Sequence, residues 1–458
     1  MSTRTSRSWA DSCCWLLPDQ ASTRSIASRH AGSDLGVRRT NPPGIKLGCR
    51  WLALLLGAIV SGGCVSTPRR PPPPDLISDA APEGFPPDIR LLTIDRARFA
   101  REAPALLRGL GRSVPYGKIN ILVLSGGGAG GAFGAGALAG LAEAHARPEF
   151  QLVTGVSAGA LVAPFAFLGA AWDPQLRKVF EGGDIERLQQ SLTWGVIGRI
   201  LFPQGIGGHD RLADLVDHSI TDAMIDAVAR QAATGRKLIV ATTDLDDQET
   251  VLWDMGAIAM RGGTAAHELF RKVLTASASV PGVFPPVLIR VRDGDKVYDE
   301  MHVDGSVTTP LFVVPLIAHV LTEGSSELNG ANLYAIVNGK LAMQPEETPI
   351  NTIKILMDSF SAQITYKTRD ALALVIASAR RNRMDFRLTD IPAEYPSGSF
   401  LDFHRAHLRQ LFGYGESCAK RGLLWTNPEQ SMRHSLYRHP DEAALRTACP
   451  DAALRISD

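Results

Sequence analysis

The sequence predicts an α/β protein in which helices cover both faces of a central, mostly parallel sheet. Short apolar runs with the character of buried strands alternate with longer helical segments along much of the chain. Glycine-rich turns connect several of these strands to the helices that follow. This alternation is typical of parallel sheets, because a crossover helix returns the chain to the edge where the next strand starts. We therefore expect a three-layer α/β/α fold.

The expected elements follow from runs of apolar residues and the turns between them. Strands are expected at 119–124, 152–154, 237–242, 249–253 and 333–337, with a hairpin of 288–291 and 296–298 around Asp293-Gly294. Helices are expected at 133–146, 158–168 and 352–381. The chain then divides into a leader with an export signal at 1–63, a Pro-rich linker at 64–90, a core domain at 117–320, and a segment at 321–458 that completes the sheet and adds helices.

The charge distribution excludes one large class of function. The 458 residues carry a net charge of only +1, whereas nucleic-acid binding needs a basic face to neutralise phosphates. The first 63 residues hold eight Lys or Arg against three Asp, a net charge of +5, which leaves −4 for the remainder. The basic excess therefore belongs to the leader, and we expect no nucleic-acid partner.

The leader has the order of an export signal. Basic residues precede the apolar run 51–60, and the small residues Ser61-Gly62-Gly63 lead to Cys64. The run is too short for a membrane span. Small residues ending in Cys resemble a bacterial lipoprotein signal, so Cys64 is the expected lipidation site. We expect an exported protein that is anchored to a membrane through lipid (the outer membrane, facing the periplasm) or is periplasmic, with its true start near Val37.

Few cysteines remain after such processing. Cys418 and Cys449 would either form one disulfide or stay as free thiols, and the sequence favours neither. No Cys or His spacing typical of a metal site occurs, and no motif requires a cofactor. We therefore expect neither metal nor cofactor.

The segment 155–159 matches G-x-S-x-G between an expected strand and an expected helix. Glycines at both flanks, Gly155 and Gly159, allow a sharp turn that projects the Ser157 hydroxyl from the end of the sheet at a helix N-terminus. Serine in this setting is the nucleophile of many ester hydrolases. Ser157 is thus the candidate nucleophile.

A second glycine-rich turn follows the expected strand 119–124. Clustered glycines at a strand end can direct several backbone N–H groups at one point, as an oxyanion hole requires. The candidate residues are Gly126, Gly127, Gly128, Ala129 and Gly131. A dinucleotide fingerprint, G-x-G-x-x-G, is the alternative, but it needs an acidic residue at the end of the next strand. No Asp or Glu lies between Phe150 and Trp172, which disfavours this alternative.

The third motif is His302-Val303-Asp304-Gly305-Ser306, which follows an expected β segment. Asp-Gly alone predicts only a turn. In this order, however, the three motifs resemble the patatin-like phospholipase family, and the stretches 241–245 and 276–286 resemble it as well. The resemblance covers about residues 119 to 310.

The resemblance implies a Ser157–Asp304 dyad without a catalytic histidine. Ser157 would attack an acyl ester, Asp304 would take its proton, and N–H groups near Gly127, Gly128 and Ala129 would stabilise the oxyanion. The expected substrate is a lipid or other acyl ester, and we expect Asp304 to be desolvated with a raised pKa. This chain has Gly130 where the family usually has Arg or Lys, and Ser306 where it usually has Gly or Ala.

Two alternatives remain open. One is a Ser–His–Asp hydrolase of another α/β fold, whose histidine would be a late one; a structural role is expected for His302. The candidate histidines are His404, His434 and His439. The other alternative is an exported scaffold or lipid-binding protein without catalysis, which the absence of a cation at Gly130 favours.

Overall fold

The computed structural model describes residues 69–73, 80–93, 109–114, 117–181, 183–186, 188, 210–312, 328–342, 347–393, 395–396 and 398–436. The chain divides into two units, residues 1–63 and 64–458, and all of the described residues belong to the second. The expected export signal, the lipidation site Cys64 and the second cysteine Cys449 lie outside the described residues.

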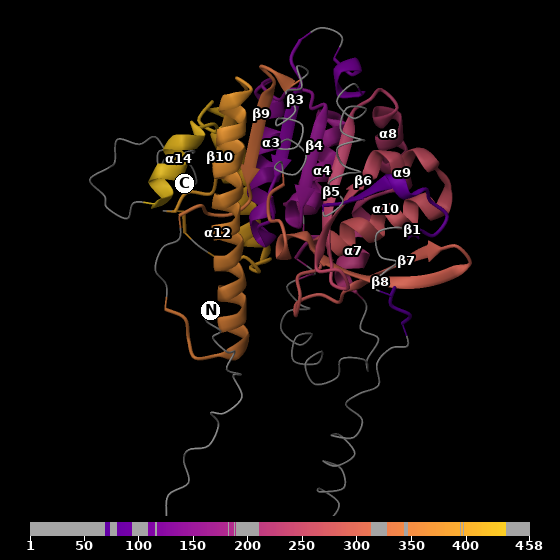
Figure 1. Ribbon diagram of the computed structural model, residues 1–458. Coiled ribbons are helices and arrows are strands. Elements are labelled where there is room, and N and C mark those ends of the chain that lie inside the picture. Colours follow the sequence, from indigo (N-terminus) through magenta and orange to yellow (C-terminus); the bar gives the residue numbers. More distant parts are fainter. Residues whose placement is uncertain are drawn as a thin grey trace, which may run out of the picture. The chain divides into compact units, whose positions relative to one another are not determined.

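A ten-stranded mixed sheet forms the centre of the second unit (Figure 1). Its main path runs in the order β1-β7-β8-β5-β4-β3-β9-β10, while β6 pairs with β5 and β2 pairs with β6. The strands are β1 (Ala81–Pro82), β2 (Arg90–Leu92), β3 (Asn120–Leu124), β4 (Leu152–Val156), β5 (Lys237–Asp244), β6 (Glu249–Asp254), β7 (Val287–Asp293), β8 (Lys296–Asp304), β9 (Asn332–Val337) and β10 (Asp385–Asp390).

The middle of the sheet is a parallel block of β5, β4, β3, β9 and β10, and the remaining pairs are antiparallel. Residues of β3 are buried on both faces because alternate side chains enter different cores. Leu122 and Leu124 belong to one apolar cluster, whereas Ile121 and Val123 belong to another. The expected three-layer α/β fold is therefore confirmed, with an antiparallel extension on the β5 side.

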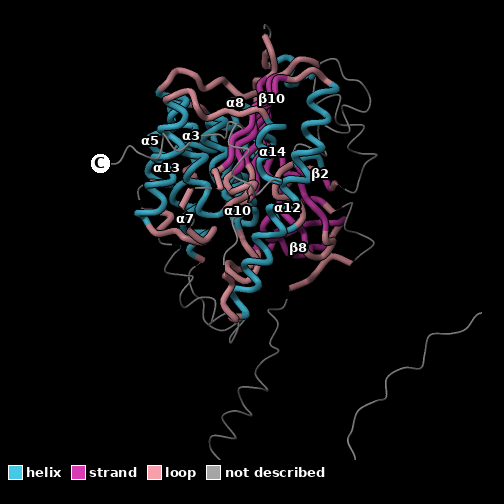
Figure 2. The backbone as a smooth tube through the Cα atoms, turned by 90° about the vertical axis from the view of Figure 1, so that its left-hand side faces the viewer, coloured by secondary structure: helices cyan, strands magenta, loops and turns pink. Residues whose placement is uncertain are grey.

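Helices cover both faces of the sheet, as Figure 2 shows with α3, α5 and α13 on one side of the strands and α12 on the other. The α-helices are α3 (Gly131–Glu143), α4 (Ala158–Leu168), α5 (Asp173–Phe180), α7 (Arg211–Ser219), α8 (Asp222–Ala232), α9 (Met255–Arg261), α10 (Gly263–Ala278), α12 (Thr352–Arg381), α13 (Arg405–Lys420) and α14 (Pro428–Leu436). Short 3₁₀ helices are η1 (Pro87–Ile89), η2 (Gly128–Gly130), η3 (Ala170–Trp172) and η4 (Gly305–Val307). None of the helices in the described part of the chain is long and apolar enough to cross a membrane.

The long helix α12 has the bounds that its sequence predicts, and its ends show why. Asn351 caps the first turn by accepting a hydrogen bond of 3.0 Å from the N–H of Lys354. Arg380 and Arg381 lie in the last turn, where positive charge favours the helix dipole. One face of α12 buries Leu372, with its helical neighbours, against the sheet.

The segment 64–90 differs from the expected spacer. Arg69 binds Asp246 with two hydrogen bonds of 2.6 and 2.8 Å, and β1 pairs with β7. The strand β2 pairs with β6 in turn. Proline disfavours the centre of a sheet, but a Pro-rich chain can occupy a sheet edge, as β1 does here. The described part of 64–90 is therefore fastened to the domain.

Two smaller expectations concern the hairpin and the cysteines. The expected hairpin forms, with Gly294 and Asp295 as the turn between β7 and β8, and β8 continues farther than expected, to Asp304. Cys418 is buried in α13 and is disulfide-bonded; the residue expected as its partner, Cys449, lies outside the described residues.

Candidate active site

Ser157 lies at the tight turn between β4 and α4 and adopts a left-handed backbone conformation, with φ of 55° and ψ of −126°. A non-glycine residue in this region is strained, and such strain is typical of nucleophile turns. The flanking glycines are required by close contacts. A Cβ on Gly155 would lie 2.6 Å from the carbonyl oxygen of Gly159, and one on Gly159 would lie 2.5 Å from that of Leu124. The turn therefore accepts only glycine at both flanks.

Ser277, at the end of α10, fixes this turn from the side. The N–H of Ser157 donates a hydrogen bond of 3.1 Å to Ser277 Oγ, which donates one of 2.7 Å to the carbonyl of Ala241. Both groups are buried. Ser277 lies in the family-like stretch 276–286, but the sequence predicts no role for it, because a lone Ser in a helix has no local feature that indicates such a contact.

The sheet register brings Asp304 next to this turn. Val156 pairs with Ala241 of β5, and Thr242 of β5 pairs with Asp304 at the end of β8. Gly305 then lets the chain pass close over β5, because a Cβ there would lie 2.5 Å from the carbonyl oxygen of Ala241. The Asp-Gly pair is thus explained by a close backbone approach rather than by a turn alone.

The side chains of Ser157 and Asp304 form a buried pair. Ser157 Oγ donates a hydrogen bond of 2.6 Å to Asp304 Oδ2, and the N–H of Ser306 donates one of 2.7 Å to Oδ1. Burial raises the pKa of Asp304 to about 6, although the hydrogen bonds from Ser157 and Ser306 lower it in part. The expected desolvation of this carboxylate is therefore present. A base with this pKa is well suited to take a proton at neutral pH.

The glycine loop contributes fewer free N–H groups than the sequence suggests. The N–H of Gly126 donates to Pro310, that of Ala129 donates to Phe400, and that of Gly131 closes the 3₁₀ turn η2. Those of Gly127 and Gly128 have no acceptor among the described residues. Among the five expected donors, Gly127 and Gly128 therefore keep an N–H group without an acceptor in the described part of the chain, because the fold uses the other three.

Asn338, directly after β9, holds this loop against the sheet. Its side chain donates a hydrogen bond of 2.7 Å to the carbonyl of Ser125, and its N–H donates one of 2.9 Å to Ser125 Oγ. Its own carbonyl lies 2.0 Å from the position of a Cβ on Gly130. Side chains other than hydrogen do not fit at Gly130 while Asn338 holds this place. Asn338 could not be predicted from the sequence, because a single Asn after a strand belongs to no motif with a characteristic spacing.

A cavity of about 180 Å³ contains Ser157, Asp304 and the glycine loop. Its walls are largely apolar and come from α12, the segment 391–400 and α13. They include Phe360, Ile364, Ile391, Phe400 and Leu411. The rings of Phe360 and Phe400 approach each other, with centroids 6.3 Å apart. Lys354 and Asp358 also line the cavity, and they pair with each other at 2.7 Å.

No histidine among the described residues is hydrogen-bonded to Ser157 or Asp304, although His407 of α13 lines the same cavity. His302 is buried between Thr242, at 3.0 Å, and Glu300, at 3.2 Å, which gives it the structural role expected for it. His404 is exposed and bonds Asp402 at 2.6 Å. The side chain of His434 and the whole of His439 lie outside the described residues.

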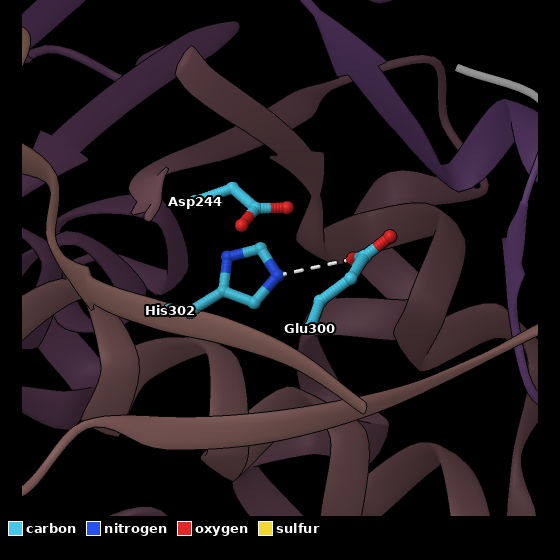
Figure 3. Close-up of side chains that lie close together, drawn as sticks. All are labelled: Asp244, Glu300 and His302. Carbon is cyan, nitrogen blue, oxygen red and sulfur yellow. Dashed lines mark hydrogen bonds and ion pairs between the residues drawn. The ribbon is translucent and has the colours of Figure 1, made fainter. Parts of the chain in front are cut away.

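Asp244, Glu300 and His302 form a second buried cluster, shown in Figure 3. Arg90 of β2 binds both oxygens of Glu300. Burial alone would raise the pKa of Glu300, but Arg90 and His302 more than offset it and hold it at about 2. Burial also raises the pKa of Asp244, whose Oδ2 has no hydrogen-bond partner among the described residues.

The same three side chains could provide one imidazole and two carboxylate ligands, since their ligand atoms lie within 4.8 Å of one another. Such a donor set suits a divalent transition metal. Arg90, however, already neutralises Glu300 and occupies both of its oxygens. We therefore assign the cluster to the ion-paired junction of β2, β5 and β8 rather than to catalysis.

Comparison with known proteins finds a family match within the chain. Residues 122–317 match the family model of the patatin-like phospholipases. Among solved structures, the chain matches VipD from Legionella pneumophila with 15% identity and a TM-score of 0.31, over 69% of this chain and 67% of that one. No curated protein sequence gives a significant match.

Proposed function

Because residues 122–317 form a patatin-like phospholipase domain, we propose that the protein cleaves carboxylic esters of lipids through a Ser157–Asp304 dyad and an acyl-enzyme. Family membership supports lipid acyl hydrolysis in general, and the site geometry supports the specific residues. The observation that carries the proposal is the hydrogen bond of 2.6 Å from Ser157 Oγ to Asp304 Oδ2 inside the cavity.

In the first half of the proposed reaction, Ser157 Oγ attacks the acyl carbonyl while its proton passes to Asp304 Oδ2. The tetrahedral intermediate then collapses, the ester C–O bond breaks, and the leaving alkoxide takes the proton from Asp304. In the second half, water attacks the acyl-enzyme and gives its proton to Asp304, which returns a proton to Ser157 as the fatty acid leaves. A carboxyl with a pKa of about 6 can serve in both directions near neutral pH.

The N–H groups of Gly127 and Gly128 are the proposed oxyanion donors. They have no acceptor among the described residues, and their loop lines the cavity together with Ser157. Each fixed donor directed at the developing oxyanion stabilises the transition state more than the neutral ester. In this chain position 130 adds no cation beside these donors, because Gly130 has no room for a side chain.

The apolar walls of the cavity support an acyl chain as the bound part of the substrate. Phe360 and Ile364 from α12 and Phe400 from the facing segment would contact the hydrocarbon. An acyl chain that enters this cavity leaves water, and each Å² of apolar surface buried contributes roughly 25 cal/mol to binding. The proposal therefore places the fatty acyl group in the cavity and the alcohol part toward its opening.

A panel of acyl esters, including phospholipids and lysophospholipids, tests the proposal on purified protein. Ser157→Ala and Asp304→Asn should each lower turnover by at least a thousandfold, while Ser359→Ala, which removes a hydroxyl from α12, and Asp385→Asn on β10 should not change it. A fluorophosphonate probe should label the wild type and Asp385→Asn but not Ser157→Ala. Ester hydrolysis that survives in Ser157→Ala would overturn the proposal.

The two rival functions predict different results in the same assays. If a Ser–His–Asp triad operated, a single His404→Ala, His434→Ala or His439→Ala substitution would abolish turnover; under the dyad, none should. If the chain were a non-catalytic lipid-binding protein, the probe would fail to label Ser157 in the wild type.

We further propose that the protein is exported and anchored through lipid on Cys64. The basic start, the apolar run 51–60 and the small residues before Cys64 support this proposal. Cys64→Ala should move the protein from the membrane fraction to the soluble fraction without changing esterase activity. An N-terminus upstream of Cys64 in the mature protein would contradict it.

A further inference from the structure

Ser306 has a buried hydroxyl next to the dyad that makes no hydrogen bond of good geometry among the described residues. The residue is 1% exposed. Two observations place the hydroxyl. A Cβ on Gly126 would lie 2.3 Å from Ser306 Oγ and 3.2 Å from Ser157 Cβ, so both serines pack closely against the same glycine. Ser306 Oγ is also close enough to Asp304 to lower the pKa of its carboxyl.

A buried hydroxyl without a partner is unfavourable, and most native proteins avoid it. In the resting site, both oxygens of Asp304 are already bonded, Oδ2 by Ser157 Oγ and Oδ1 by the N–H of Ser306. In the resting site, the Ser306 hydroxyl therefore lies beside a carboxylate whose two oxygens already accept hydrogen bonds from other groups. A serine hydroxyl rotates freely and can donate in whichever direction an acceptor appears.

The proposed reaction creates such an acceptor. When Ser157 is acylated, its Oγ carries the acyl group in place of the proton and no longer donates to Asp304. Once Asp304 has passed its proton to the leaving alkoxide, it is a buried carboxylate with one donor fewer. An ion in this state needs a replacement hydrogen bond.

We infer that Ser306 is a positioning residue whose hydroxyl donates to the Asp304 carboxylate while Ser157 is acylated. The inference rests on the proposed dyad and extends it. Ser306 exchanges no proton with the substrate; it holds Asp304 in place until water arrives to be deprotonated. It also accounts for Ser at a position where the family usually has Gly or Ala.

Charged groups near Asp304 do not provide this function. Along β8 and β5, His302 and Asp244 belong to the ion-paired cluster. From α12, Lys367 donates to the carbonyls of Val307 and Thr308, at 2.9 and 3.3 Å. Only hydrogen bonds from Ser157 and Ser306, together with burial, shift the pKa of Asp304 among the described residues. The pH dependence of turnover should therefore report on these two donors.

Ser306→Ala tests the inference in the full-length enzyme. Loss of a donor to a carboxylate should move the acid limb of the turnover–pH profile upward by roughly one to two units, since such bonds are worth about 1.5–3 kcal/mol and one pKa unit is 1.36 kcal/mol. In this variant deacylation should slow more than acylation. A chromogenic ester should therefore give a larger initial burst of released alcohol with the variant than with the wild type. Ser306→Thr, which keeps a hydroxyl, should restore the wild-type acid limb.

Thr389→Val is the matched control, because Thr389 on β10 also has a buried hydroxyl without a partner and lies outside the cavity lining. It should leave the pH profile and the burst unchanged. If Ser306→Ala is poorly folded, Ser306→Gly provides the same comparison. If a Ser306 variant shows an unshifted acid limb and an unchanged burst while its activity still requires Ser157, the inference about Ser306 is wrong and the dyad is unaffected. Hydrolysis by Ser157→Ala would instead overturn the dyad on which it rests.

Discussion

At the scale of single residues, the site combines a serine in a strained conformation with a carboxylate removed from water. Ser157 keeps a positive φ, and Asp304 is 1% exposed. Neither arrangement favours folding, because the strain and the desolvation are both relieved when the chain unfolds. The residues proposed to carry the chemistry are therefore expected to lower the stability of the native state.

Asp304→Asn should make the protein more stable at neutral pH while removing activity. The folded-state pKa of about 6 lies above the ordinary value of 3.8, so the contribution of this group favours folding below pH 4 and is lost as the pH rises through 6. The amide has no charge to desolvate, and the gain should approach about 3 kcal/mol at pH 8. Urea unfolding at pH 4 and pH 8 measures it: the gap between variant and wild type should widen with pH. An equal gap at both values would contradict the assignment.

Gly130→Lys introduces the kind of basic residue that the family usually has at this position, but we expect it to impair the enzyme. A Cβ at this position would meet the carbonyl oxygen of Asn338 at 2.0 Å, so the loop must shift. We expect at least a tenfold loss of turnover and destabilisation of about 1–3 kcal/mol. Gly413→Lys is the control, since a Cβ there meets no atom within 4 Å. A more active Gly130→Lys enzyme would show that the loop adapts.

The residue scale also shows what could be predicted from sequence. Ser157 and Asp304 stand in motifs whose resemblance to the patatin-like phospholipases implies their pairing, and the structure brings them together. Ser277 and Asn338 could not be predicted, because their partners lie 120 and 213 residues away in the chain. The sequence also could not predict which backbone N–H groups of the glycine loop lack an acceptor. Which N–H groups remain free depends on where the carbonyls of Pro310 and Phe400 come to lie.

At the scale of elements, the parallel block positions the site by placing β3, β4 and β9 side by side. The glycine loop follows β3, the nucleophile follows β4, and Asn338 follows β9. Their carboxyl ends meet at one edge, where α/β proteins commonly place their sites. These strands and α12 were predictable from apolar periodicity. The two-residue β1 and three-residue β2 were not, because runs this short have no period to detect.

Asn338→Ala should disorder the glycine loop without unfolding the sheet. The variant loses the hydrogen bond to the Ser125 carbonyl, and displacement of the oxyanion donors by a fraction of an ångström should lower kcat by roughly tenfold to a hundredfold with little change in KM. Steady-state kinetics on one chromogenic ester measures both constants. Asn332→Ala, at the opposite end of β9, is the control and should retain wild-type kcat. Equal losses in the two variants would indicate a general effect on β9.

At the scale of the whole domain, the pair of Arg90 and Glu300 joins the early segment to the strand that ends in Asp304. Both side chains are buried, at 3% and 0% exposure, and the guanidinium also donates a hydrogen bond of 2.7 Å to the carbonyl of Ala80. A buried pair of this kind contributes little net stability over an apolar pair, yet loss of one partner is costly. The junction therefore depends on both residues together.

Arg90→Met should lower the free energy of unfolding by about 3–5 kcal/mol, because it leaves Glu300 buried without its counter-ion. The double variant Arg90→Met with Glu300→Leu should recover most of that loss. Thermal and urea unfolding of the wild type, both single variants and the double variant give the coupling energy directly. A stable Arg90→Met variant would show that His302 alone can neutralise Glu300.

The fastening of residues 80–93 to β6, β7 and β8 means that the folding unit is larger than the recognised family region. That region starts at residue 122 and contains Glu300 but not Arg90. A fragment cut to its bounds would lose β1, β2, β9 and β10, which exposes the edges of β7, β6 and β3, and it would bury an uncompensated carboxylate. The family match in this protein therefore covers the proposed catalytic residues, whereas the contacts that complete this side of the sheet begin upstream of it, at residues 80–93.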